Sequence, residues 1–206
     1  MCVAVQLENR PFDHVFGWRE GVNGLTGEEY NDIILPDAAT KKGAGGDGNS
    51  SAGNRVYVDS ECPYINTCDP AHNTDSTTYK LFGGSSNSNG EPSPNSGFVS
   101  YERSNPDYCN VMSGFKPADL PIINSLADEF AVMDRFFAAH PGPTWPNRMY
   151  TLSGTSAGST ETFYWYQGVN GALFPQKTIF DQIGEGSGSR GEVGIGLPIA
   201  VPQVWC

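Results

Sequence analysis

An acidic and an amide side chain stand directly after a short apolar run near the start of the chain. The run Val3–Leu7 has the length and β-branched content of a buried strand in a parallel sheet. Glu8 and Asn9 follow it. Because ligands bind at the carboxyl ends of strands in open α/β sheets, we predict that these two side chains ligate a divalent cation. The alternative is a polar loop that only ends the strand.

A hydroxyl suited to nucleophilic chemistry lies far downstream, at Thr144. Proline is tolerated in the first turn of a helix, so the sequence predicts a helix that starts around Pro146. Thr144 then lies at the positive end of that helix. A nearby metal ion would lower the pKa of its hydroxyl, and backbone N–H groups would receive phosphoryl oxygens, so the pattern favours attack on phosphorus. The alternative is a threonine that simply caps the helix.

The elements that position Thr144 are predicted from residues 116–138. Asp119 is a suitable helix cap, and the following apolar residues recur at helical spacing, which predicts an apolar face packed on a sheet: Leu120, Ile123, Ala127 and Phe130. Residues 131–133 then predict a short strand that leads toward Thr144. This order places the hydroxyl after a strand and before a helix, as in α/β catalytic loops.

Several longer strings, taken together, are more specific than either motif alone. They are ENRPFDHVFGW at 8–18, NGLTG at 23–27, DPAH at 69–72, MSGF at 112–115, TWPNR at 144–148, TSAG at 155–158 and FPQKTIF at 174–180. In this order they resemble the phosphoesterase family of bacterial phospholipases C and plant non-specific phospholipases C, within the alkaline phosphatase superfamily. The resemblance covers about residues 3–183.

The resemblance implies an α/β fold: part of an alkaline-phosphatase-like domain, with a mostly parallel sheet flanked by helices and with long irregular loops. We expect residues 1–183 to be the amino-terminal part of a phosphoesterase domain. Stretches rich in Gly, Ser and Asn at about 41–54 and 83–96 predict flexible insertions. Residues 184–206 match nothing expected of the family, so we expect a disordered or aberrant tail.

The resemblance also implies roles for individual residues. Thr144 would be the catalytic nucleophile, His72 would act at the phosphate site, and a divalent ion (Ca, Mg, Mn or Zn) would be the cofactor. It also implies that Glu8, Asn9 and Thr144 ligate the metal ion, and that Arg148 and Asn147 contact the substrate phosphate. Asp13 and His14 would hold the metal ligands in place. His140 has no motif and is predicted to be a loop residue.

Three functions fit these motifs. The first is a phospholipase C that cleaves phospholipid head groups, and the second is an acid-phosphatase-like phosphomonoesterase with the same motif set. The third is a truncated, non-catalytic remnant that binds phosphate or a partner. It is motivated by a missing string, since family members carry an Asp-Glu pair followed by Gly and Asp-His in their later half, and this sequence has none.

Composition and charge further limit the number of domains and the kinds of partner that fit this chain. The 206 residues are 38% hydrophobic, which suits one domain core, and the formal net charge is −11. Such an acidic chain without a basic patch disfavours nucleic acid as a partner, because phosphate-backbone binding needs clustered cations. No run reaches the length of a transmembrane helix. The expected partner is therefore a phospholipid or another phosphoester; localisation and oligomeric state are not predicted.

The five cysteines do not define a disulfide framework, because their number is odd. Cys62 and Cys68 flank a short loop and are candidates for a disulfide in an oxidising compartment. The aromatic run at 163–166 predicts a core or pocket wall rather than a lipid anchor.

Overall fold

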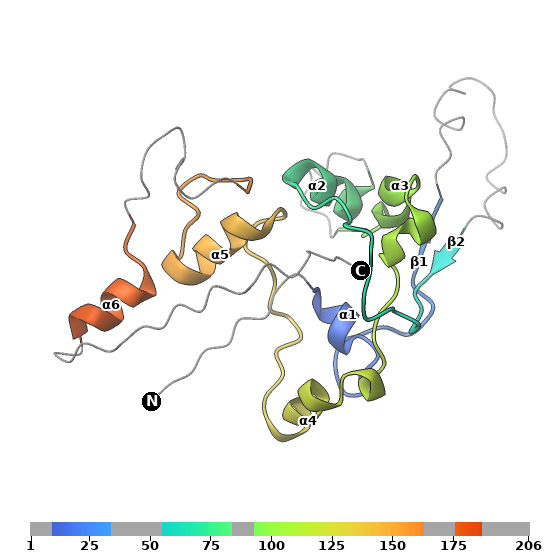
Figure 1. Cartoon of the computed structure of the whole chain (residues 1–206), viewed down its shortest axis with the longest axis horizontal. Coiled ribbons are helices and arrows are strands. Elements are labelled where there is room, and N and C mark those ends of the chain that lie inside the picture. Colours follow the sequence, from blue (N-terminus) through green and yellow to red (C-terminus); the bar gives the residue numbers. More distant parts are fainter. Residues whose placement is uncertain (1–9, 34–54, 84–92, 163–175, 187–206) are drawn as a thin grey trace. The chain divides into compact units, whose positions relative to one another are not determined.

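The computed structural model of the chain describes residues 10–33, 55–83, 93–162 and 176–186 (Figure 1). The chain divides into two compact units. Among the described residues, the first unit contains 10–71 and 78–136, and the second contains 72–77 and 137–186, with the gaps given above.

Some predicted features lie outside the described residues. They are the ligands Glu8 and Asn9, the insertion at 41–54, most of the insertion at 83–96, the aromatic run at 163–166 and the tail beyond Gly186.

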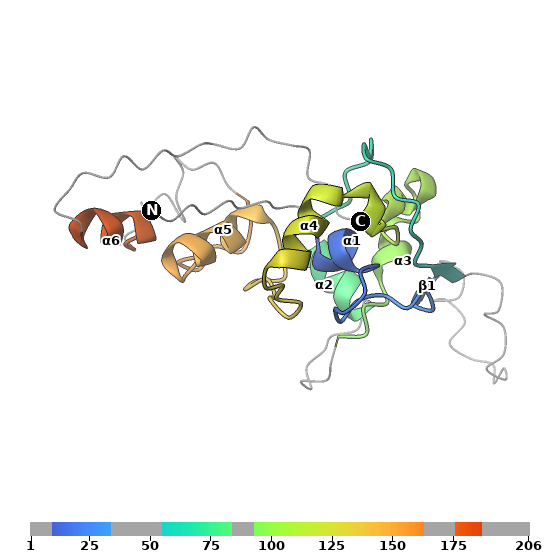
Figure 2. The ribbon, with the colours of Figure 1, turned by 90° about the horizontal axis from the view of Figure 1, so that it is seen from below.

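The first unit contains a small sheet. Strands β1 (Tyr30–Asp32) and β2 (Arg55–Tyr57) pair antiparallel, with Tyr30 opposite Tyr57 and Asp32 opposite Arg55. The two tyrosine rings lie 5.5 Å apart, and Arg55 Nε lies 3.2 Å from the Asp32 carboxylate. Helix α3 (Phe98–Glu102) lies beside β1 in both views (Figures 1 and 2). The cross-strand pairs fix the register of this sheet.

This sheet differs from the predicted one. Within the described part of the chain the only sheet is two-stranded and antiparallel, and the only parallel pairing is one isolated bridge between Asp59 and Ser113. The strand predicted at 131–133 is wrong, because these residues form a loop. A strand needs a neighbour for its backbone groups, and no described segment pairs with this one. The mixture of helices and strands is confirmed, and the mostly parallel sheet is not seen.

Helix α4 (Pro121–Glu129) is shorter than the predicted helix. The Asp119 carboxylate accepts a hydrogen bond from Lys116 N at 2.9 Å and so closes the preceding turn η3 (Pro117–Asp119) instead of capping α4. Pro121 lies in the first turn of α4, where proline is tolerated. The packing on a sheet is wrong, because α4 packs on η3 and Phe130 is exposed.

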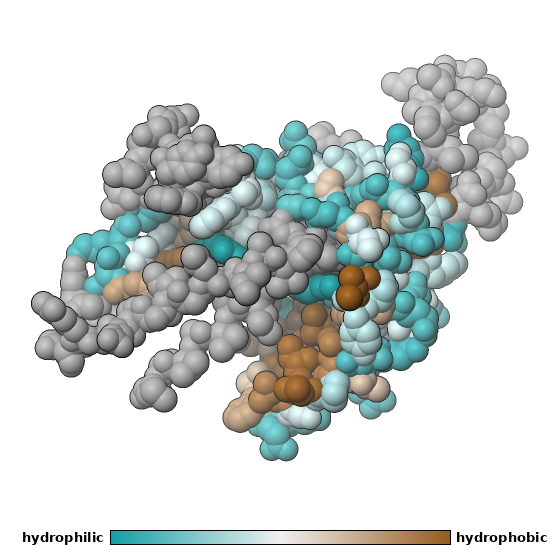
Figure 3. All heavy atoms as spheres, viewed as in Figure 1, coloured by the Kyte–Doolittle hydropathy of each residue, from teal (hydrophilic) through white to brown (hydrophobic). Residues whose placement is uncertain are grey.

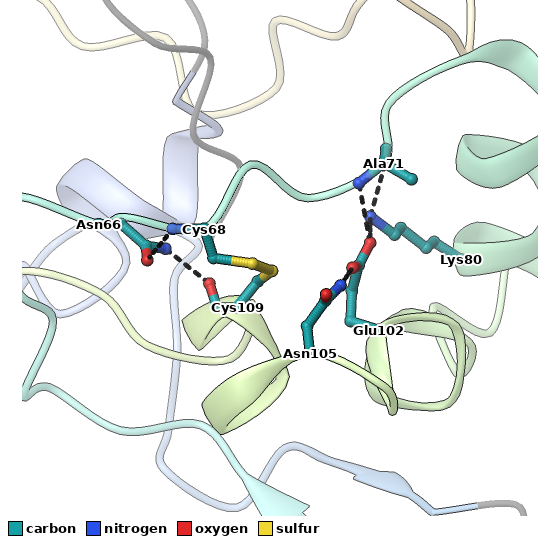
Figure 4. The surroundings of a disulfide bond; sticks show 7 residues. All are labelled: Asn66, Cys68, Ala71, Lys80, Glu102, Asn105 and Cys109. Atoms are coloured by element: carbon teal, nitrogen blue, oxygen red, sulfur yellow. Dashed lines mark hydrogen bonds and ion pairs between the residues drawn. A yellow bond between two sulfur atoms is a disulfide. The ribbon is translucent and has the colours of Figure 1, made fainter.

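The core of the first unit is small and cross-linked. Val99, Cys109 and Val111 are buried together. A disulfide joins Cys68 to Cys109, with Cα atoms 5.2 Å apart (Figure 4). The predicted Cys62–Cys68 pairing is therefore wrong, and Cys62 lies against the ring of His14 instead.

The disulfide anchors an unusual turn. Residues 107–110, within the 3-10 segment η2 (Pro106–Asn110), all have positive φ between 46° and 57°. This left-handed conformation costs roughly 1–2 kcal/mol per residue other than glycine. The Asn66 amide donates to Cys109 O at 2.7 Å, so a hydrogen bond and the covalent link both stabilise the turn.

A buried ion pair links α2 (Thr74–Phe82) to α3 (Figure 4). Lys80 Nζ lies 2.7 Å from Glu102, and the two side chains are 5% and 2% exposed. Both charges have further partners, since Lys80 donates to Ala71 O while Glu102 accepts from Ala71 N and Asn105. Burial lowers the pKa of Lys80, and the Glu102 carboxylate opposes that shift.

The second unit is built on two helices, α5 (Thr144–Ser153) and α6 (Ile179–Gly186), which contact each other. Gly154 ends α5 with φ 72°, the left-handed conformation that glycine adopts most readily. Thr178 precedes α6, and its N and Oγ1 donate to the Asp181 carboxylate at 2.7 and 2.8 Å; these two bonds lower the pKa of Asp181. Helix α6 extends to Gly186 and so includes the first residues assigned to the tail.

Among the described helices, none combines the length and apolar character needed to cross a membrane.

We expect removal of the disulfide to lower the stability of the chain. We expect the double variant Cys68→Ser/Cys109→Ser to lose about 2–5 kcal/mol of unfolding free energy, because the unfolded chain is no longer cross-linked and the left-handed turn loses its anchor. Chemical unfolding measures this loss, with Cys62→Ser as the matched control. Peptide mapping under non-reducing conditions that linked Cys62 to Cys68 would contradict the assignment.

We expect substitutions of Lys80 and Glu102 to have non-additive effects on the free energy of unfolding, because the two charges are paired. Lys80→Met leaves the buried Glu102 carboxylate unpaired and is expected to cost about 3–5 kcal/mol. Lys80→Met/Glu102→Gln removes both charges and keeps an oxygen acceptor, so we expect it to be more stable than Lys80→Met alone. Urea unfolding of both variants tests this expectation. A double variant less stable than the single one would show that the pair is not coupled as described.

Candidate active site

Thr144 is the first residue of α5. The helix therefore begins two residues earlier than predicted, and the capping position belongs to Pro143 rather than to Thr144. Pro146 is buried in the first turn, as expected for proline at a helix start. The hydroxyl lies at the positive end of a ten-residue helix, where the first backbone N–H groups have no intrahelical acceptor.

The side chain of Asn147 closes the loop that precedes Thr144. Its Oδ1 accepts from His140 N at 3.0 Å. Its Nδ2 donates to the carbonyl oxygens of His140, Gly142 and Pro143 at 3.0–3.3 Å. Both ends of the amide are thus engaged within the loop, and the structure gives Asn147 a role in shaping the site.

His140 connects this loop to the start of α2. Its Nε2 lies 3.1 Å from Thr74 Oγ1 and 3.2 Å from Thr160 O. Thr74 Oγ1 donates its single proton to Thr160 O at 2.6 Å. Because the Thr74 hydroxyl and the Thr160 carbonyl both accept in this arrangement, the tautomer with a proton on His140 Nε2 satisfies both contacts. A Cβ at Gly142 would approach the His140 ring to 2.7 Å, so glycine is required where the imidazole passes the loop.

This network brings together two segments that the sequence separates. His72 precedes Thr74 by two residues, and both belong to the same unit as Thr144. Sequence reasoning assigned His140 to a loop without function, and the structure shows it as the link between these segments. The sequence feature that could have indicated a role for His140 is its position in the short loop before Thr144, but no motif includes His140.

Arg148 adds a positive charge near the same end of α5. It lies one turn after Thr144, so the two residues share a face of the helix. Its guanidinium lies over the Trp145 ring, 5.6 Å from the centroid. Partial burial lowers the pKa of Arg148. A planar cation beside the helix N-terminus suits a phosphate group.

Two further predicted site residues, Asp13 and His14, lie in the first unit. His14, on α1 (Phe12–Phe16), is 2% exposed; its Nδ1 donates to Ser113 O at 3.0 Å, its Nε2 accepts from Arg10, and its ring packs edge-on against Phe115. The neighbouring Asp13 is exposed. Its pKa is raised by partial desolvation and then by the Glu29 carboxylate.

Of the three predicted metal ligands, the structure describes only Thr144, because Glu8 and Asn9 lie outside the described residues. Within the described ranges no three His, Cys, Asp or Glu side chains come close enough to hold a metal ion.

Comparison with known proteins identifies the family. A model of the Phosphoesterase family matches residues 1–188. Non-specific phospholipase C1 of Arabidopsis thaliana is 38% identical over 92% of this chain and 33% of its own length, and non-specific phospholipase C6 is 35% identical over 88% and 32%. Hemolytic phospholipase C of Pseudomonas aeruginosa is 40% identical over 25% of this chain and 7% of its own length.

The chain therefore belongs to the phosphoesterase family, which confirms the resemblance seen in its motifs. It spans about a third of the length of the plant relatives that it matches.

The network around His140 predicts coupling between two positions 66 residues apart. We expect His140→Ala and Thr74→Val each to destabilise the chain by about 1 kcal/mol, because each removes a hydrogen bond. Since they remove the same bond, the double variant should lose less than the two single losses added together. Chemical unfolding of the four proteins gives the coupling energy. His140→Ala combined with Ser125→Ala, a substitution in the first unit, is the control and should be additive. Additive behaviour of the first pair would contradict the contact.

Proposed function

We propose that the chain carries the nucleophile segment of a phosphoesterase of phospholipase C type, which cleaves phospholipid head groups. The observation that carries the proposal is the position of Thr144: a hydroxyl at the first residue of a helix, behind a loop fixed by Asn147. Membership of the phosphoesterase family supports the same chemistry. A helix N-terminus receives phosphoryl oxygens, so the substrate phosphorus comes to lie beside the hydroxyl.

The proposed reaction has two displacements at phosphorus. Thr144 Oγ loses its proton to solvent and bonds to phosphorus while the bond from phosphorus to the glycerol oxygen breaks, and diacylglycerol leaves after its oxygen receives a proton. Water then bonds to phosphorus, one proton of that water passes to Thr144 Oγ as the bond to Thr144 breaks, and the phosphorylated head-group alcohol is released. His72 donates the proton or hydrogen bond to the leaving oxygen, and Arg148 holds two phosphoryl oxygens through its planar fork.

The donor set fits a divalent cation. Glu8, Asn9 and Thr144 offer a carboxylate, an amide oxygen and a hydroxyl, which are the hard oxygen ligands that Mg²⁺ and Ca²⁺ prefer, and Mn²⁺ or Zn²⁺ also accepts oxygen ligands. Such an ion supplies Lewis-acid activation of the hydroxyl. Asp13 and His14 are proposed to support the ligands. Because its amide is engaged in the loop, Asn147 acts mainly by positioning Thr144, and its predicted phosphate contact stays a prediction.

A second candidate is a non-catalytic remnant that binds phosphate without turnover. Thr144, Arg148 and the helix N-terminus would still attract a phosphate group in such a remnant.

Substitution of Thr144 separates these functions. We expect Thr144→Ala to lower hydrolysis at least about 100-fold, because the attacking oxygen is removed, whereas Thr144→Ser keeps a hydroxyl and retains measurable turnover. Thr151→Ala, on the same helix, is the matched control. Release of phosphocholine from phosphatidylcholine and of phosphate from a phosphomonoester are measured in parallel, each with and without a metal chelator.

The outcomes are distinct. Faster cleavage of the monoester would favour a phosphatase, and phosphate binding without any turnover would favour the remnant. A Thr144→Ala variant as active as the parent would show that Thr144 is not the nucleophile. Activity unaffected by the chelator would contradict metal assistance. Mass spectrometry of the reacting parent is expected to find phosphate on the peptide that contains Thr144.

A further inference from the structure

Two charged side chains are buried in the first unit, whereas large apolar side chains of the same unit are exposed. Lys80 and Glu102 are 5% and 2% exposed. Figure 3 shows hydrophobic residues gathered at the surface over α4 and the loop that follows it. A buried ion pair is often no more stabilising than a well-packed apolar pair of similar volume, because both charges lose their hydration. Stability alone therefore does not account for the presence of this pair.

The contacts of the pair indicate a more specific role. Glu102 Oε1 accepts from Ala71 N at 3.0 Å, and Lys80 Nζ donates to Ala71 O at 2.7 Å. Both backbone groups of one residue are thus bonded to one ion pair, as Figure 4 shows. Glu102 is itself oriented by Asn105, whose Nδ2 donates to Oε2 at 2.6 Å. An apolar pair could fill the same space, but it could neither donate to Ala71 nor accept from it.

The two helices that carry the pair approach each other closely. Gly97 precedes α3, and its N–H donates to Lys80 O at 2.9 Å. A Cβ at Gly97 would come within 2.2 Å of Tyr79 O, so glycine is required where α3 begins beside α2. The Lys80 ammonium also lies 5.5 Å from the centroid of the Tyr101 ring. These contacts fix the place at which the pair meets the backbone of Ala71.

The next residue in the chain is His72, the proposed donor to the leaving oxygen. Because a peptide bond is planar, the hydrogen bond to Ala71 O orients the whole peptide that joins Ala71 to His72. On the other side of His72, Asn73 caps α2, since its Oδ1 accepts from Ser76 N at 2.8 Å. Asn73 O also accepts from the buried Ser76 hydroxyl at 2.9 Å. His72 is therefore a single residue between two neighbours whose backbone is fixed.

We propose that the Lys80–Glu102 pair positions His72 toward the leaving oxygen of the phosphoester. The proposal rests on the proposed function, in which His72 donates to that oxygen. Both charged side chains are buried, so they act through the backbone of Ala71 and are positioning residues. A proton donor must lie within hydrogen-bond reach of its acceptor, and a small misplacement lowers the rate steeply. A pair that only tied α2 to α3 would stabilise the chain without affecting His72.

Two double variants remove the bonds to Ala71 in steps. Lys80→Met/Glu102→Gln keeps an acceptor for Ala71 N and loses the donor to Ala71 O, whereas Lys80→Met/Glu102→Leu loses both. Val99→Ala is the matched control, because Val99 is fully buried on the same helix α3 and its truncation lowers stability without removing a bond to Ala71. Circular dichroism sets a temperature at which the proteins are folded. Should the Leu variant not fold, the Gln variant decides.

The first measurement is the release of phosphocholine from phosphatidylcholine. We expect kcat to fall at least about tenfold in Lys80→Met/Glu102→Gln and further in Lys80→Met/Glu102→Leu, with KM within about twofold of the parent value. Val99→Ala should keep the parent kcat. When His72→Gln is already present, substitution of the pair should cause no further loss, because the pair acts through His72.

The second measurement does not require turnover. The chain has three histidines, so the ring C–H signals of His72 can be assigned by NMR through comparison with His72→Gln. We expect the chemical shifts of the His72 ring to change in both double variants and to stay in place in Val99→Ala. The ring of His14, which donates to Ser113 O in the first unit, is the internal reference and should not change.

The outcomes separate this proposal from the proposed function. If the parent hydrolyses no phosphoester, the proposed function is wrong, and the His72 signals alone decide whether the pair positions this residue. Unchanged His72 signals in the folded double variants would overturn the positioning role. In an active chain, a loss of kcat no larger than that of Val99→Ala would overturn it as well, and so would equal losses with and without His72.

Discussion

The side-chain amide of Asn147 is the contact on which the geometry of the candidate site depends. It accepts from one backbone N–H and donates to three carbonyls of the loop between His140 and Pro143. Asn147 stabilises the conformation of this loop because its amide bonds backbone groups of His140, Gly142 and Pro143, and the last two residues are buried. Thr144 therefore starts its helix at a defined place relative to the segment that carries His72.

The first unit has few buried apolar side chains, so its stability depends on other interactions as well. A disulfide fixes a left-handed turn, and a buried Lys80–Glu102 pair ties two helices to the backbone of Ala71. The ion pair fixes the geometry of its surroundings because both buried charges have further hydrogen-bond partners. Cross-linking compensates for a core whose apolar burial alone would be a weak source of stability.

The hydroxyl, the arginine and the helix N-terminus of the candidate site belong to the second unit, whereas the disulfide and the buried ion pair belong to the first.

Local rules made part of this protein predictable from its sequence. Proline in a first turn located α5 to within two residues, and ordered motifs identified the family, because both depend on residues close together in the chain. Tertiary structure alone decided that Cys68 pairs with Cys109, that His140 contacts Thr74, and that residues 131–133 form no strand. Each of these outcomes depends on partners distant in sequence, or on their absence within the described residues, and neither spacing nor propensity encodes such partners.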